Sequence, residues 1–332
     1  MRRNSVSLIS AIVAAFAIQA AAYPAFAQAP FPNRSMTLVV PFAAGGPNDV
    51  MSRIVGEHMS RTLGQPIIIE NVTGAGGTNG SARVANGTPD GYTFLSGHVG
   101  THAAAPALYA SLRYDPVRDF SPIGLVAETP ILVATRRDLP VTSLKAFIDL
   151  AKAQGPAMTL GHAGVGSISH ISCLLLTSLL ATKPVEVPYH GSALAMTDLL
   201  AGRVDFTCSL LVDALAYAEG DRLRFLAVSA PARVPQMPSV PTVAEAGLAQ
   251  FTASSWFGFY LPRATPDAIR DRLDAALRSA LDDATVRKKL EAAGLILPPP
   301  DQRGPEALKR RMTDDIARWS TIVKNAKIQL DR

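Results

Sequence analysis

The stretch VVPFAAGGPNDVMSRI, from Val39 to Ile54, predicts the fold class of this chain. A short apolar run ends in a glycine turn, and apolar residues then recur at helical spacing, as expected of a strand that leads into a helix. Free amide groups at a helix start attract anions, and glycine lets a ligand approach them closely. The turn has neither the lysine of a P-loop nor the G-x-G-x-x-G spacing of a dinucleotide site. Another kind of anion is therefore indicated.

The order of strand, glycine or serine turn, and helix recurs along the chain. Strands are expected near residues 36–40, 66–70, 92–95, 158–161, 185–189, 204–211, 223–229 and 254–262. Alternation of strands with helices predicts an α/β fold with parallel pairing. Two extended passages, near residues 128–138 and 250–262, would join two α/β lobes. We expect residues 28–131 and 253–332 in lobe 1, residues 132–252 in lobe 2, and a ligand cleft between the lobes.

The N-terminus predicts export. Arg2 and Arg3 precede an apolar run from Leu8 to Ala22, and Ala25-Phe26-Ala27 is a small-residue cleavage site. This order is typical of a secretory signal peptide, here residues 1–27 with cleavage after Ala27. We therefore expect an exported protein.

Composition narrows the function classes. The chain of 332 residues is 48% hydrophobic and 18% charged, as in a compact globular protein. Its basic residues are scattered apart from Lys309-Arg310-Arg311, and aromatics are only 6% of the chain, so nucleic-acid binding is not indicated. Cys173 and Cys208 lie in apolar segments without C-x-x-C spacing. An exported chain permits a disulfide, but we favour two free, buried cysteines.

Four turns follow the carboxyl ends of expected strands, where ligands bind in open α/β sheets. They are PFAAGGPN (41–48), LSGHVGT (95–101), GHAGVGSIS (161–169) and PYHGSAL (188–194), and none contains lysine or arginine. An anion held there would be held by amides, hydroxyls and water. The titratable groups of these turns are histidines, so mild acidification would add positive charge near an anion and raise its affinity. These histidines are His98, His162, His170 and His190.

Several blocks in fixed order resemble one family. LVVPFAAGGPND, GQPIIIENVTGAGGTNG, PDGYTFL, GVGSISH, VPYHGSALAMTDLLAGRVD, VPTVAEAG and SSWFGFYLP are similar to blocks of the Bug (TctC-like) family. Its members are the periplasmic receptors of tripartite tricarboxylate transporters. The resemblance implies a type II periplasmic-binding-protein fold, a small carboxylate ligand, integral membrane permease subunits as partners, a monomer, and no cofactor, metal or catalysis.

The resemblance also implies a set of ligand-binding residues. Two opposed turns would grip the carboxylate, with residues after the 92–95 strand nearby. The expected residues are Phe42, Ala43, Gly45, Gly46, Asn48, Asp49, Ser96, Gly97, Gly164, Val165, Gly166, Ser167 and His170. Asp49 carries the same charge as the ligand, so we interpret it as organising its turn. Ala44, His162 and His190 depart from residues common in the family, which leaves the identity of the carboxylate open.

Three other functions compete with this one. Ser167 and His170 suggest a hydrolase, but no G-x-S-x-G elbow surrounds Ser167. His98 and His102 have a spacing found in metal sites, but no acidic or cysteine partner lies near them in the sequence. A receptor that serves a membrane sensor instead of a permease has the same sequence features, so that alternative stays open.

Overall fold

The computed structural model describes residues 31–325, and those from Arg34 onward form one compact unit. The expected signal peptide lies outside the described residues. No helix of the described part is both long and apolar enough to span a bilayer.

The described unit is built on one nine-stranded mixed sheet, with strand order β2-β1-β3-β9-β4-β7-β5-β6 and β8 paired with β4. Its strands are β1 (Met36–Val40), β2 (Ile67–Asn71), β3 (Thr93–His98), β4 (Phe120–Arg136), β5 (Thr159–His162), β6 (Val185–Pro188), β7 (Phe206–Leu210), β8 (Leu223–Ser229) and β9 (Ser254–Pro262). Each expected strand is present, with ends that shift by at most three residues.

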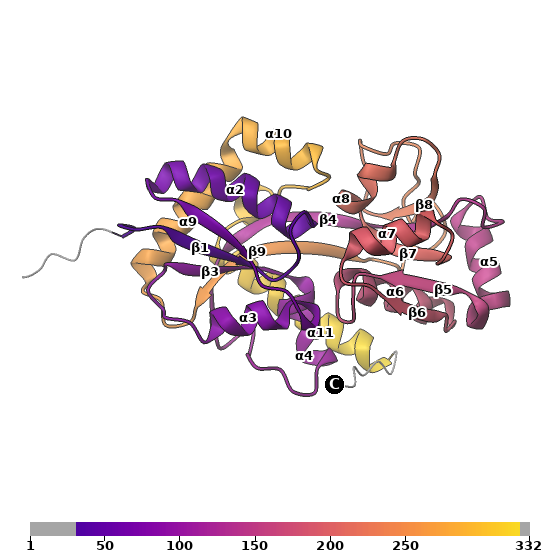
Figure 1. Ribbon diagram of the computed structural model, residues 1–332, viewed down its shortest axis with the longest axis horizontal. Helices are drawn as coiled ribbons and strands as arrows, with labels where there is room; N and C mark the ends of the chain where they lie inside the picture. The colour runs from indigo at the N-terminus through magenta and orange to yellow at the C-terminus, as the bar shows by residue number, and fades with distance from the viewer. Residues whose placement is uncertain (1–30, 326–332) are drawn as a thin grey trace, which may run out of the picture. The chain divides into compact units, whose positions relative to one another are not determined.

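Strand β4 belongs to both parts of the sheet (Figure 1). Residues 120–130 pair with β9, and residues 131–136 pair with β7 and β8. The partner therefore changes between Pro130 and Ile131. We call the part with β1, β2, β3 and β9 the first lobe, and the part with β5, β6, β7 and β8 the second lobe.

The expectation of parallel pairing is only partly correct. β1 is parallel to β2 and β3, and β5 is parallel to β6 and β7. However, β9 is antiparallel to both β3 and β4, and β4 is antiparallel to β7 and β8. The chain returns from the second lobe as β9 and inserts between β3 and β4. An alternation of strands and helices along the sequence does not reveal such a long-range insertion.

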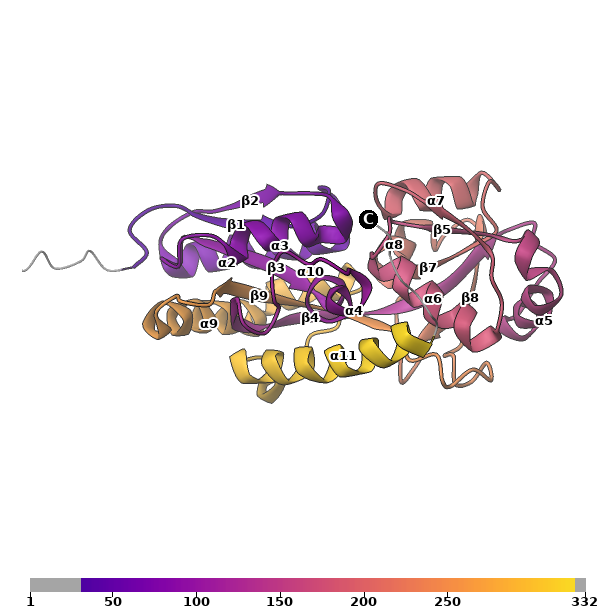
Figure 2. The same ribbon diagram turned by 90° about the horizontal axis from the view of Figure 1, so that it is seen from below.

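Helices cover both lobes. In the first lobe, α2, α9 and α10 pack together, and α11 packs on α4 and β4. Figures 1 and 2 show α2 and α11 on opposite sides of the first-lobe strands. The helices are α2 (Pro47–Leu63), α3 (Thr78–Ala85), α4 (Ala105–Leu108), α5 (Leu144–Gln154), α6 (Ile168–Leu180), α7 (Ser192–Leu200), α8 (Leu211–Ala214), α9 (Asp267–Asp282), α10 (Ala284–Ala292) and α11 (Pro305–Asn325). A π-helical turn, Gly100–Ala104, precedes α4.

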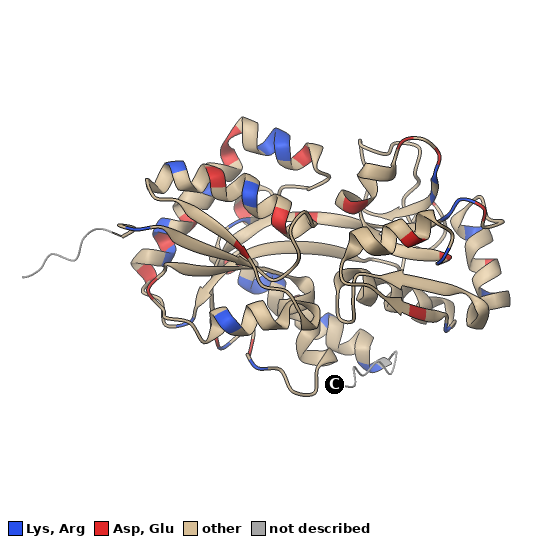
Figure 3. Ribbon diagram, viewed as in Figure 1, with Lys and Arg blue, Asp and Glu red and all other residues tan. Residues whose placement is uncertain are grey.

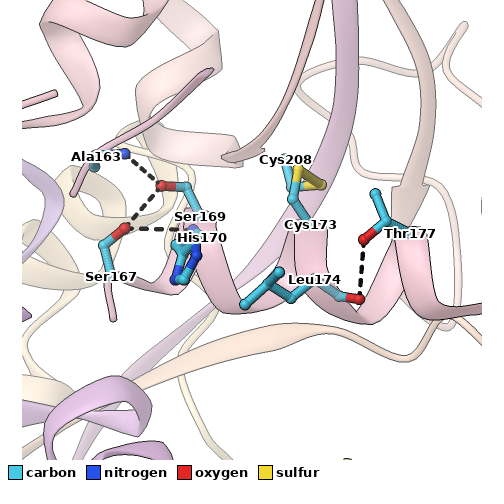
Figure 4. Close-up of a disulfide and its surroundings, with 8 residues drawn as sticks. All are labelled: Ala163, Ser167, Ser169, His170, Cys173, Leu174, Thr177 and Cys208. Atoms are coloured by element: carbon cyan, nitrogen blue, oxygen red, sulfur yellow. Dashed lines mark hydrogen bonds between the residues drawn. A yellow bond between two sulfur atoms is a disulfide. The ribbon is translucent and has the colours of Figure 1, made fainter. Parts of the chain in front are cut away.

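The cysteine prediction is wrong, because Cys173 and Cys208 form a disulfide. Cys173 lies on α6 and Cys208 on β7, and both are completely buried. The bond ties α6 to the second-lobe sheet, three residues after His170 (Figure 4). The two residues are 35 positions apart without a motif, so their pairing depends on the fold.

Candidate functional site

A cleft of about 1390 Å³ lies between the lobes. The first lobe contributes residues 41–48, 73–78 and 109–113, with His98, Ser255 and Phe257. The second lobe contributes residues 163–165, 167–169 and 188–194, with Leu210 and Asp213. Three of the four expected turns thus meet around one cavity, and the fourth reaches it through His98.

Eight of the thirteen predicted ligand-binding residues line this cleft, and five do not. Those that line it are Phe42, Ala43, Gly45, Gly46, Asn48, Gly164, Val165 and Ser167. Those outside its lining are Asp49, Ser96, Gly97, Gly166 and His170. Each of these five supports a lining element, as the contacts below describe.

Asp49 stabilises the turn at residues 43–46, which we call the first turn. Its buried carboxylate accepts hydrogen bonds from the Gly45 amide at 2.9 Å, from Arg53 at 2.9 Å and from Asn71 at 3.0 Å. Burial alone would raise the pKa of Asp49, but the hydrogen bonds from these three residues lower it below its usual value. The carboxylate is thus an anion that faces its own turn. This geometry matches the interpretation that Asp49 organises the turn.

Ser96 and Gly97 support the same region from β3. Asn48 donates to the Ser96 carbonyl at 2.9 Å, and the Ser96 hydroxyl bonds the Asn48 side chain in return. A Cβ on Gly97 would lie 2.6 Å from the His102 ring and 2.9 Å from the Tyr260 ring. Glycine at this position therefore lets His102 stack on Tyr260, with ring centroids 4.0 Å apart.

His98 is a neutral hydrogen-bond donor in the cleft lining. The Gly100 amide donates to its Nδ1 at 2.8 Å, so the ring proton lies on Nε2, which has no protein partner. Burial lowers the pKa of His98 to about 3. The ring lies against Phe42, with centroids 4.7 Å apart. Buried polar groups without a partner are rare, and this N–H is one of them.

Serine hydroxyls hold the turn at residues 163–167, which we call the second turn (Figure 4). Ser167 caps α6 by accepting from the His170 amide at 3.3 Å, and Ser169 accepts from the Ala163 amide at 2.9 Å. The two hydroxyls also bond each other at 3.1 Å. Because the Ser167 hydroxyl contacts the backbone and Ser169 instead of the His170 ring, the pair lacks the geometry of a nucleophile and its base.

The His170 ring bridges the turn and β6. The Gly166 amide donates to Nδ1 at 3.1 Å, and Nε2 lies 3.2 Å from a Glu186 oxygen. His162 joins this pair, so that His162, His170 and Glu186 offer ligand atoms within 4.8 Å of one another. A metal on Nε2 would require a proton on Nδ1, which already accepts from Gly166. The Nε2 proton instead serves the hydrogen bond to Glu186. No spacing in the sequence indicated this cluster.

Tyr109 contacts the second turn from across the cleft. Its hydroxyl lies 3.1 Å from the Ala75 carbonyl in its own lobe and 3.4 Å from the Val165 carbonyl in the second lobe. Gly166 has φ +78°, and a Cβ there would lie 2.5 Å from the same hydroxyl. The second turn therefore touches both walls of the cleft. Residues 73–78 and 109–113 were missed in the sequence, because no residue pattern linked them to the four turns.

Charged groups are scarce in the cleft. Among its lining residues, Arg113 and Asp213 are the only members of the Lys, Arg, Asp and Glu group. Figure 3 shows that charges of both signs instead mark α2, α9 and α10, outside the sheet. That amides, hydroxyls and water would hold an anion in these turns stays a prediction.

The expected role of the histidines in pH dependence is wrong for two of the four. Burial lowers the pKa of His98 to about 3, and burial together with the neighbouring His170 lowers the pKa of His162 to about 4. Both rings therefore stay neutral under mild acidification. They cannot supply the positive charge that the sequence suggested.

Comparison with known proteins adds independent findings. The family model described as "Tripartite tricarboxylate transporter family receptor" matches residues 51–328. MatC (Rpa3494) from Rhodopseudomonas palustris, solved with bound malate, is 42% identical with a TM-score of 0.84, over 88% of this chain and all of that chain. R. palustris Rpa4515, solved with adipate, and the periplasmic binding protein BugD are each 34% identical with a TM-score of 0.84. Each comparison covers 90% of this chain and all of the other.

Proposed function

Because this chain belongs to the family of tripartite tricarboxylate transporter receptors, we propose that it captures a small carboxylate in its cleft and delivers it to a membrane transporter of that type. The fold is the predicted type II periplasmic-binding-protein fold, with two α/β lobes. Receptors of this family are not enzymes, and we propose that this chain likewise releases its ligand unchanged.

One observation carries the proposal: two glycine-containing turns, one from each lobe, line the same cleft with few charged neighbours. The first is Ala43–Gly46, held by Asp49, and the second is Ala163–Ser167, of which all but Gly166 line the cleft and which is held by Ser167 and Ser169. Backbone amides of such turns bind carboxylates without a full positive charge. Reversible capture suits a receptor that must release its ligand.

We propose that one ligand carboxylate lies between these turns. Its direct contacts would come from Phe42, Ala43, Gly45, Gly46, Asn48, Gly164, Val165 and Ser167. Asp49, Ser96, Gly97, Gly166 and His170 would act indirectly, since each holds a lining element in place. The malate and adipate in the two R. palustris structures are consistent with a dicarboxylate ligand.

The cleft is wide for such a ligand. Its volume of about 1390 Å³ exceeds the roughly 300–1,000 Å³ typical of small-molecule pockets. We therefore propose that the lobes, with boundaries near residues 131/132 and 252/253, close over the ligand about the crossing strands.

The test is a thermal-shift screen of mono-, di- and tricarboxylates against the chain from residue 28 onward, followed by calorimetry. A ligand at 100 times its dissociation constant should stabilise the protein by about 2.7 kcal/mol. Calorimetry should give one site per monomer, and chromatography should recover the ligand unchanged. If no carboxylate shifts the unfolding temperature, or if the ligand is converted, the proposed function is incorrect.

Delivery to a permease and export to the periplasm need a cellular test. Deletion of the gene should abolish uptake of the radiolabelled ligand, and the plasmid-borne gene should restore it. A gene that lacks codons 2–27 should not restore uptake, because its product would stay in the cytoplasm. Normal uptake in the deletion strain would instead favour a receptor for a sensor.

A further inference from the structure

Asp213 is an acidic side chain in a cleft proposed for an acidic ligand. It lies on α8, directly after β7, and lines the cleft together with Leu210 and Ser192. A ligand carboxylate near an ionised Asp213 would be repelled. The presence of this side chain in the wall therefore calls for a physical explanation.

The contacts of Asp213 leave part of its carboxylate unengaged. The Ser192 hydroxyl donates to Oδ1 at 2.9 Å. Within residues 31–325 no Lys, Arg or His forms an ion pair with Asp213, and its Oδ2 has no hydrogen bond from the protein. Burial raises the pKa of Asp213 to about 7, an effect that the Ser192 hydrogen bond partly offsets. A ligand group that donates a hydrogen bond to Oδ2 would therefore stabilise the carboxyl group of Asp213.

A purely structural role accounts for only one of the two oxygens. The bond from Ser192, the first residue of α7, fastens the 188–194 turn to α8. A neutral acceptor such as an asparagine oxygen would serve that bond equally well, without the cost of a half-buried charge. The second oxygen and the charge remain to be explained.

We propose that Asp213 determines specificity by accepting a hydrogen bond from a hydroxyl or ammonium group of the bound carboxylate. The ligand class is then a short carboxylic acid that carries a hydrogen-bond donor beside its carboxylate, as opposed to the unsubstituted acid. This inference rests on the proposed function. The turns hold the carboxylate, and Asp213 selects the substituent.

The charges of the lining residues explain why the turns would bind the carboxylate and Asp213 the substituent. Arg113, on the first lobe, is the one Lys or Arg side chain of the described lining, and it donates to Asn79 at 2.5 Å. In this proposal the carboxylate is bound by the turn amides and by neutral hydroxyl donors. On the second lobe an ionised Asp213 accepts but does not donate, so next to this side chain it favours an ammonium or hydroxyl and disfavours a carboxylate.

The experiment compares ligands that differ only at one substituent. Affinities of the wild type and Asp213→Asn are measured by calorimetry at about pH 8 for succinate, malate and aspartate. A second series is glutarate, 2-hydroxyglutarate and glutamate. In the series that binds more tightly, the wild type should prefer a substituted acid over the plain one by about tenfold or more, as expected for a hydrogen bond to a charged group. In Asp213→Asn this preference should fall below about threefold, and the plain acid should bind more tightly than before.

The two donor classes are distinguished within the same data. A positively charged ammonium should lose more affinity in Asp213→Asn than a hydroxyl does, because only the ammonium also loses a charge pair. Asp149→Asn, on α5 and outside the cleft lining, is the matched control and should keep the wild-type preference. Asp213→Asn retains an acceptor for Ser192, and unfolding curves check that both variants fold.

Three results would contradict the proposed role of Asp213. Equal affinity of the wild type for plain and substituted acids overturns the role of Asp213 and leaves the carboxylate receptor intact. An unchanged preference in Asp213→Asn assigns selection to another residue and also overturns it. If no acid of either series binds, and the wider screen also fails, both this inference and the proposed function fall.

Discussion

Gly164 lines the cleft and also has a backbone conformation that favours glycine. Its φ is +115°, and a Cβ there would lie 3.1 Å from the Tyr189 carbonyl. Side chains rarely adopt this backbone conformation, so substitution would displace the second turn.

We expect Gly164→Ala to weaken carboxylate binding by about tenfold or more, since about 1.4 kcal/mol of lost contact suffices. Gly202→Ala is the matched control. Gly202 has φ +73° in the same lobe, but it does not line the cleft, and a Cβ added to it would meet no atom within 4 Å. Calorimetry should show full affinity in the control. Equal losses in both variants would mean that strain in the lobe, not the second turn, determines affinity.

Buried histidines predict an acid-sensitive fold. The folded-state pKa is about 3 for His98 and about 4 for His162, against about 6.5 for an exposed imidazole. Below about pH 6.5 the unfolded chain takes up protons that the folded chain does not, so stability falls as pH falls. On acidification from about pH 7.5 to about pH 5.5, each of these histidines should lower the free energy of unfolding by about 1.4 kcal/mol.

Urea unfolding of His162→Leu at the two pH values tests this expectation. The variant should lose about 1.4 kcal/mol less than the wild type on acidification. It should be at least as stable at the higher pH, because two unpartnered ring nitrogens are removed. An identical pH dependence in His162→Leu would show that this ring titrates alike in both states.

Residue patterns in the sequence predicted most of the elements around the site but not all of its walls. β8 was expected at the residues where it occurs, and the turn after β1 could be recognised because glycine, proline and helical spacing are local signals. Tyr109 and Asp213 could not be found in this way. Each reaches the cleft through pairings between distant segments, and neither stands in a glycine turn.

At the scale of elements, the disulfide connects α6, which begins at the second turn, to β7. Closing a loop of this length restricts the unfolded chain, and the 35-residue separation corresponds to about 4 kcal/mol of stabilisation. We expect the Cys173→Ala/Cys208→Ala variant to unfold at correspondingly lower urea concentration. Dithiothreitol should destabilise the wild type and leave the double variant unchanged. Equal stability of the wild type and the double variant would show that packing alone fixes α6.

At the scale of the whole molecule, closure of the cleft is the motion to be measured. If the lobes rotate about the strands that cross between them, a saturating carboxylate should decrease the radius of gyration in small-angle scattering. Gly164→Ala at the same ligand concentration serves as the control and should show less of the decrease. An unchanged radius of gyration at proven saturation would indicate a rigid pocket.

The position of β9 has a consequence for how the chain acquires its structure. β9 lies between β3 and β4, although more than a hundred residues separate it in sequence from both. Until residues 254–262 are available, the strands that precede them expose unpaired edges, and a nascent chain cannot complete its first lobe. If the chain is exported, as we propose, this delay would keep it from folding before it crosses the membrane. Once residues 254–262 are present, β9 can pair with both β3 and β4 and complete the first lobe.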